Sequence, residues 1–248
     1  MNKTSYFSIL FIIFFVACTQ NSQDSKQTSG PSQKIGNGKV FAWTKTGDDG
    51  NVKSVGFTLT KGALENLPHD GVNLDLMFAS NTLGKIPFEH IYLNYLHHGH
   101  EPPGVYDVTH FDMHFYMQTV QERSAIPPYT GAAMAKFDNL PSDGHMPIPY
   151  IRLPGGVPGM GVHWANPTSK ELAGNGKFDQ TLLFGSYDGK MTFIEPMVTL
   201  DFLISKPSFT GSVPMPSKFA KTGLFPQKYS IKQVGDNIEV SLDEMILK

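Results

Sequence analysis

Histidine is the residue type in this sequence that offers the clearest chemistry. The chain of 248 residues has nine histidines, and six of them fall within 25 residues. In an extended chain, residues two apart point to the same face. His98 and His100 are therefore predicted to share a face, and so are His110 and His114 with Asp112 between them. The second strand would carry an imidazole–carboxylate–imidazole face.

A turn between these two segments brings them together in the predicted fold. Pro102-Pro103-Gly104 has the composition of a turn, so His98 and His100 are expected to lie beside His110 and His114. Imidazoles at this density suit a divalent transition metal, with zinc as the expected ion. Cupins and α-type carbonic anhydrases use a similar arrangement of histidines on strands. The alternative is a histidine-rich face that is hydrogen-bonded and holds no metal.

Carboxylates and one further histidine extend the candidate site. Asp112 is a secondary ligand candidate that can bind the metal directly or orient an imidazole, and Glu101 can do the same. His163 follows a glycine-rich segment and is a candidate ligand or general acid/base, although a loop packed by Trp164 explains it equally well. Glu195 lies in an apolar setting and needs a partner if buried. The candidate catalytic residues are thus His163, Glu101 and Glu195.

The elements that position these residues are predicted to be strands. Apolar residues alternate with a period of two over most of the chain after residue 40, and 24 glycines and 18 prolines indicate many turns. Tyr187-Asp188-Gly189-Lys190 predicts a two-residue type I′ turn. Extended segments are expected over 90–98 and 109–119, and a long Gly/Pro-rich loop over 126–167. The predicted fold over 39–248 is a single all-β antiparallel domain, barrel-like or sandwich-like, with few short helices.

The N-terminal segment has the pattern of an export signal. Lys3 precedes an apolar run that is too short to cross a membrane as a helix and ends at Cys18. Phe15-Val16-Ala17-Cys18 resembles the bacterial lipobox, whose cysteine is lipidated, although Phe15 departs from its usual Leu, Val or Ile. We expect a signal peptide over 1–18, lipidation at Cys18, a flexible polar tether over 19–38 and attachment to a membrane. An ordinary signal peptide is the alternative.

Charge and composition exclude several other functions. The net charge of −2 and the pI near 6.5 provide no basic surface for nucleic acid. A single cysteine excludes a Cys-rich zinc or iron–sulfur site. The sequence contains neither a Gly-x-Ser-x-Gly elbow nor a phosphate-binding P-loop.

Long blocks of the sequence resemble one bacterial family. The block His97-His98-Gly99-His100-Glu101-Pro102-Pro103-Gly104-Val105-Tyr106-Asp107, with Gly161-Val162-His163-Trp164 and Phe184-Gly185-Ser186-Tyr187-Asp188-Gly189-Lys190, resembles a domain of unknown function in secreted proteins. The family is typified by a Thermus protein under a sigma-E stress factor. Thr109 stands where the family pattern has proline. The resemblance implies an envelope protein that can form homo-oligomers, and it brings no defined activity.

Three functional hypotheses remain open at this point. The first is an exported, lipid-anchored protein that binds a divalent metal through its histidines. The second is a metal-dependent enzyme at the same site, either a cupin-like oxygenase or a hydrolase. The third is a structural envelope protein without metal.

Overall fold

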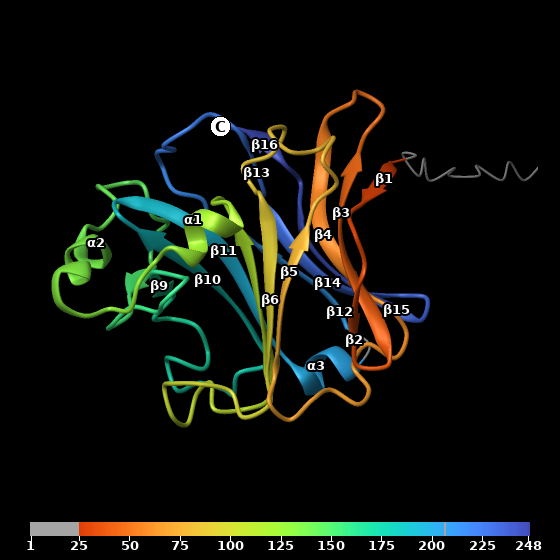
Figure 1. The fold of residues 1–248 in the computed structure, drawn as a ribbon, viewed down its shortest axis with the longest axis horizontal. Helices are drawn as coiled ribbons and strands as arrows, with labels where there is room; N and C mark the ends of the chain where they lie inside the picture. The colour runs from red at the N-terminus through yellow and green to blue at the C-terminus, as the bar shows by residue number, and fades with distance from the viewer. Residues whose placement is uncertain (1–24, 206) are drawn as a thin grey trace, which may run out of the picture.

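The computed structural model describes residues 25–205 and 207–248 (Figure 1). The predictions for 1–18 and for Cys18 lie outside these residues. The described chain forms two seven-stranded antiparallel sheets, here called sheet A and sheet B, and one two-stranded ribbon. Sheet A has the order β1 (Lys26–Ser29), β3 (Gly38–Thr46), β4 (Val52–Leu59), β15 (Asn237–Asp243), β14 (Lys228–Val234) and β12 (Ser208–Ser212), with β2 (Gln33–Ile35) paired to β3. Sheet B has the order β5 (Val72–Met77), β6 (His90–Leu96), β7 (His110–Tyr116), β11 (Lys190–Thr199), β10 (Gln180–Tyr187), β9 (Val162–Ala165) and β8 (Ile151–Arg152).

Short elements complete the described chain. The ribbon pairs β13 (Leu224–Phe225) with β16 (Ile246–Leu247), and the helices are α1 (Val120–Ser124), the 3₁₀ turn η1 (Gly131–Ala133), α2 (Met134–Asp138) and α3 (Leu200–Ile204). The prediction of an all-β antiparallel fold with few short helices is confirmed. Both sheets are open, with different strands at their two edges, so the fold is sandwich-like and not a closed barrel. Within the described residues, no helix combines the length and the apolar character needed to cross a membrane.

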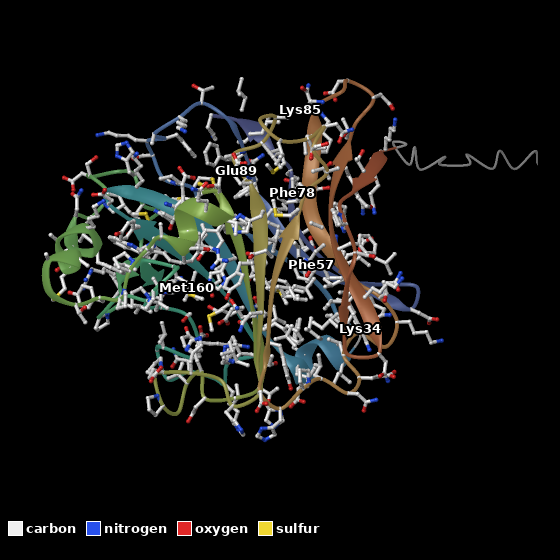
Figure 2. The ribbon with its side chains drawn as sticks, viewed as in Figure 1. Lys34, Phe57, Phe78, Lys85, Glu89 and Met160 are labelled. Atoms are coloured by element: carbon white, nitrogen blue, oxygen red, sulfur yellow. The ribbon has the colours of Figure 1, made fainter. Side chains whose placement is uncertain are left out.

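The main core fills the space between the two sheets. Alternate residues of β4 and β15 in sheet A and of β6 and β7 in sheet B contribute apolar side chains to one cluster. The ring of Phe57 from β4 lies 6.5 Å from that of Phe115 from β7, which joins the two layers. Figure 2 shows Phe57 between the sheets and Met160 on the other side of sheet B. Burying both inner faces is the main force that holds such a sandwich together.

Strand β7 has two chemically different faces, and both are buried. Phe111, Met113 and Phe115 point into the core between the sheets. His110 and His114, with Asp112 between them, point to the outer face of sheet B, and all three are at most 5% exposed. The predicted imidazole–carboxylate–imidazole face is therefore present, but it is covered.

The cover of this outer face comes mainly from the segment between β7 and β10, with Tyr106 from the loop before β7. This segment lies beside sheet B on the side away from sheet A (Figure 1). It packs two smaller apolar clusters against the sheet, one around Phe178 and Met197 and one around Phe137 and Val162. The loop predicted over 126–167 is real but contains η1, α2, β8 and β9, so it is more ordered than the sequence indicated.

Two other sequence predictions need correction. The strand expected over 90–98 ends at Leu96, because its in-register partner β7 begins at His110, which pairs with Leu96. The flexible tether expected over 19–38 is not found from Lys26 onward. Residues 26–29 and 33–35 form β1 and β2, which pair with β3 in sheet A, while residues 19–24 lie outside the described residues.

The predicted hairpin turn at residues 187–190 is confirmed. Strands β10 and β11 are joined by Asp188 and Gly189 with φ of 49° and 78°, the positive values that a type I′ turn requires. This hairpin places Glu195 on β11.

Candidate metal centre

The candidate centre lies on the outer face of sheet B, where β7 and β11 run side by side. Their register pairs Ile194 with Phe115 and Met197 with Asp112. The recorded pairing is interrupted between these two pairs, where Pro196 has no N–H to donate, but its offset is the same on both sides, so Glu195 lies across from His114. A non-local strand pairing thus brings a buried carboxylate to the histidine row.

The first group of potential ligands, the Glu195 group, consists of His114, His163 and Glu195. Glu195 Oε1 lies 3.1 Å from His114 Nε2, and Glu195 Oε2 lies 3.5 Å from His163 Nε2. His114 and Glu195 are fully buried, whereas the His163 side chain is 17% exposed. Each carboxylate oxygen therefore faces a different imidazole.

The second group, the Asp112 group, repeats this arrangement with His100, His110 and Asp112. Asp112 Oδ1 lies 3.0 Å from His110 Nε2, and Asp112 Oδ2 lies 3.6 Å from His100 Nε2. His110 is fully buried and the His100 side chain is 33% exposed. Because Asp112 and His114 are two residues apart on one strand face, the two groups are neighbours along β7.

Backbone carbonyls fix the tautomers of three of these imidazoles. The Nδ1–H of His110 donates to the Val108 carbonyl at 2.6 Å, and the Nδ1–H of His100 donates to the Glu101 carbonyl at 2.6 Å. The Nδ1–H of His114 donates across the strand to the Tyr92 carbonyl at 3.3 Å. A carbonyl can only accept, so Nε2 is left with a free lone pair in the neutral ring. An imidazole that donates one ring N–H to a carbonyl and presents the other nitrogen is typical of a metal ligand.

The contacts between imidazole and carboxylate are close without being good hydrogen bonds. Among the described residues, Nε2 of His110 and His114, Oδ1 of Asp112 and Oε2 of Glu195 are buried and lack a hydrogen-bond partner. At 3.0–3.1 Å the nitrogen–oxygen distances suit a hydrogen bond, so it is the direction that fails. Nitrogen and oxygen atoms that lie this close without a well-aligned N–H bond between them are potential ligands for a cation. These groups can hold a metal ion.

The pKa values of these residues are set by burial and by the charges that face them. Burial alone would lower the pKa of His100, but the facing Asp112 carboxylate outweighs it and raises this pKa to about 9. Burial raises the pKa of Asp112, but its two imidazole neighbours outweigh burial and lower it. For His114, burial lowers the pKa, but the Glu195 carboxylate, with the charge of Asp112, outweighs burial, so the pKa is raised. For His163 burial dominates and the pKa is lowered. A metal ion entering either group would displace protons from it.

An aromatic residue holds the Glu195 group in place. The Phe193 ring lies 4.8 Å from the His114 ring and 5.2 Å from the His163 ring, measured between centroids. It occupies the space above Gly185 of β10, where a Cβ atom would lie 2.0 Å from the ring. Gly185 pairs with His163 on one side and with Phe193 on the other. The missing side chain at Gly185 therefore lets Phe193 reach the two imidazoles.

The structure distributes the predicted ligands differently from the sequence-based expectation. His110 and His114 with Asp112 lie on one face of β7, and His100 reaches Asp112 from the loop after β6, so that these residues belong to two groups. His98 does not join them. It lies in the loop after β6, where the period-two rule does not apply, and it contacts His69 and His97.

Of the catalytic candidates, the structure brings two to the centre. His163 and Glu195 complete one group. Glu101 is exposed, and only its backbone carbonyl contacts the centre, through His100. His69 was missed because it stands alone in the sequence, and no spacing rule connects it to residues 97 and 98.

Comparison with known proteins adds no relative. The sequence matches no protein-family model, no curated protein and no solved structure. The resemblance to the secreted bacterial family therefore stays a prediction.

Proposed function

We propose that this protein is an exported, lipid-anchored protein that binds divalent transition metal ions at the Asp112 group and the Glu195 group. Zinc is the expected ion, because two imidazoles and a carboxylate are ligands that it accepts in proteins. One observation carries the proposal. Three imidazoles are fixed by carbonyls at Nδ1 while their Nε2 atoms face two buried carboxylates.

The same arrangement occurring twice argues against chance packing. In each group one carboxylate presents its two oxygens to two imidazoles, at 3.0–3.6 Å. A buried carboxylate needs a positive partner, and a divalent ion between the ligands would supply that charge in place of the protons on the imidazoles.

Metal analysis of the purified full-length chain tests this proposal. The protein is loaded with zinc, passed through a desalting column and measured for metal content. Glu195→Gln and Asp112→Asn keep the side-chain shape but remove one charge and one good ligand. We expect each to weaken zinc binding by about 100-fold or more and to abolish retention in its own group only. His145→Ala is the matched control, since His145 bonds Ser142 and lies outside both groups.

The outcome separates metal binding from a purely structural role. If the parent retains no zinc, manganese, iron, nickel or copper, and neither substitution changes metal uptake, the metal-binding proposal is wrong. The histidine row would then be a hydrogen-bonded structural feature.

An enzymatic role is the second candidate, and the ligand number favours it. Each group supplies three residues, which leaves a coordination position for water or substrate. Two histidines and one carboxylate with open positions also match non-haem iron oxygenases. Metal-dependent hydrolysis of an activated ester, or metal-dependent oxygen consumption, that Glu195→Gln abolishes would establish this role.

The membrane attachment is proposed from the sequence and has its own test. Cys18→Ser is expected to release the protein from the membrane fraction of a bacterial host while leaving its metal content unchanged. Retention of the variant in that fraction would contradict lipidation at Cys18.

A further inference from the structure

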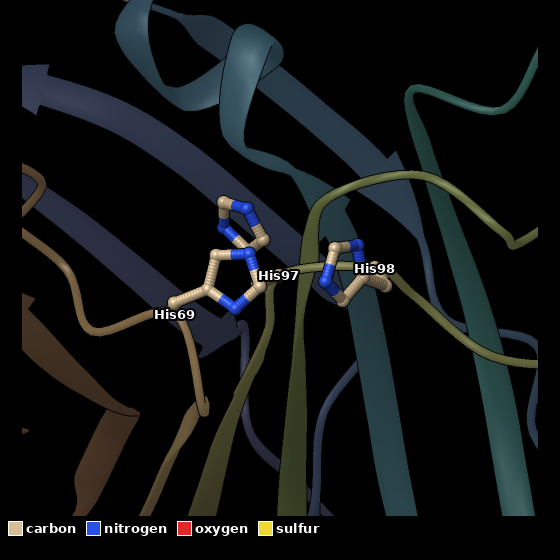
Figure 3. A group of neighbouring side chains, drawn as sticks. All are labelled: His69, His97 and His98. Atoms are coloured by element: carbon tan, nitrogen blue, oxygen red, sulfur yellow. The ribbon is translucent and has the colours of Figure 1, made fainter.

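A third group of histidines lies outside the centre, where the loop before β5 meets the end of β6. The rings of His69, His97 and His98 lie within 4.2–4.7 Å of one another between centroids. One nitrogen of each ring lies within 4.8 Å of those of the other two. Figure 3 shows His69 approaching from one segment and His97 and His98 from the other.

Two tight turns hold these segments in place. His69 lies in a turn closed by a hydrogen bond from the Gly71 amide to the Pro68 carbonyl at 3.2 Å. Gly99 follows His98 with a φ of 67°, and a Cβ atom there would lie 2.1 Å from the Tyr106 carbonyl oxygen. Only glycine fits such a position, so the chain direction after His98 is fixed.

His97 is held most firmly of the three. Its carbonyl accepts a hydrogen bond from the Thr109 hydroxyl at 2.6 Å. Its Nδ1 lies 3.1 Å from the Tyr95 hydroxyl, which can accept as well as donate. When the hydroxyl accepts, His97 Nε2 is free to bind a cation. His69 and His98 are exposed, so their side chains can adjust to an ion.

We propose that His69, His97 and His98 form a third, solvent-accessible site for a divalent late transition metal, here called the peripheral site. Three neutral imidazoles without a carboxylate favour copper, nickel and zinc over magnesium or calcium, with copper bound most tightly. Three protein ligands leave one or two positions for water, so an ion here should exchange quickly with solution.

The close spacing of the three rings suits one shared ion. Their centroids lie 4.2–4.7 Å apart, so a single ion can be bound by one nitrogen of each ring.

Copper binding to the full-length chain tests the peripheral site. The chain is loaded with Cu(II) and desalted, and the number of ions per chain is measured together with the electron paramagnetic resonance spectrum. We expect His69→Ala and His98→Ala each to lower the copper count by one and to remove a signal split by several nitrogens. His145→Ala, at a partly exposed histidine outside all three groups, is the control and should leave both unchanged. The gentler His98→Gln should lower copper affinity by at least tenfold.

A double variant separates this site from the buried centre. In Asp112→Asn/Glu195→Gln, the peripheral copper signal should persist and should be stripped by a chelator faster than the buried metal of the parent. Failure of the buried centre would leave this result intact. If His69→Ala and His98→Ala keep the copper count and spectrum of the parent, the peripheral site does not exist.

Discussion

We predict that low pH destabilises this protein through His90, which belongs to none of the proposed metal sites. His90 is fully buried on β6, and its ring stacks on Tyr116 at 5.1 Å with an interplanar angle of 5°. Neither ring nitrogen has a hydrogen-bond partner among the described residues. Its nearest carboxylate, Asp75, lies 3.6 Å away but is engaged by Arg123 at 2.9 and 3.2 Å. His90 is thus a buried imidazole with no effective counter-charge.

The sign of the effect follows from this environment. Burial is the main cause that lowers the pKa of His90 from its ordinary value of 6.5 to about 4, and Asp75 opposes it only in part. Between these two values the unfolded chain binds a proton that the folded chain does not. Stability is therefore fully present above 6.5 and is lost as the pH falls toward 4. At about 1.4 kcal/mol per pKa unit the full loss is on the order of 3 kcal/mol, and about 2 kcal/mol of it occurs between pH 7 and pH 5.

A matched pair of unfolding curves measures this loss. Urea unfolding of the metal-free protein is followed at pH 7, 6 and 5 for the parent and for His90→Phe, which keeps a ring on Tyr116. The parent should lose about 2 kcal/mol more than the variant between pH 7 and pH 5. Other titrating groups are common to both proteins and cancel in the difference. Parallel pH profiles would refute the reasoning, because they would mean that His90 has the same pKa in both states.

Three other substitutions probe the packing around the site and the core. Gly185→Ala pushes a Cβ atom into the Phe193 ring and should lower both the thermal stability, measured by calorimetry, and the zinc affinity, measured by metal titration. The control is Gly176→Ala, whose Cβ atom meets only a flexible lysine, and it should change neither quantity. Phe57→Ala removes a fully buried ring between the sheets and should lower the free energy of unfolding by about 3–5 kcal/mol in urea; a smaller loss would mean that the sheets collapse onto the gap. Arg123→Met should lower it by about 2 kcal/mol, because its partner carboxylate is partly exposed, and an unchanged melting temperature would contradict that.

Local features of the fold could be predicted from the sequence, and distant contacts could not. The hairpin at Asp188-Gly189 follows from two residues that tolerate positive φ, and the two faces of β7 follow from strict alternation. The exit of the chain from β6 at Leu96 depends on where its partner strand begins, so nothing local shows that His98 leaves the face of the strand. The approach of Glu195 to His114 depends on the β7–β11 register, which joins segments far apart in the chain.

The contrast between the two nitrogens of each imidazole is the strongest reason to assign chemistry to the outer face of sheet B. Other buried side-chain atoms of the described chain also lack a partner, both ring nitrogens of His90 among them, but none of those residues belongs to a group of potential ligands. On β7 the Nδ1 atoms of His110 and His114 bond to backbone carbonyls, while their Nε2 atoms have no hydrogen-bond partner. A structural row would gain by satisfying both nitrogens, since each unpaired buried group lowers stability by about 1–3 kcal/mol. In each ring one nitrogen is hydrogen-bonded and the other, unpaired nitrogen faces a carboxylate. This arrangement becomes favourable when a cation binds between the unpaired nitrogen and the carboxylate.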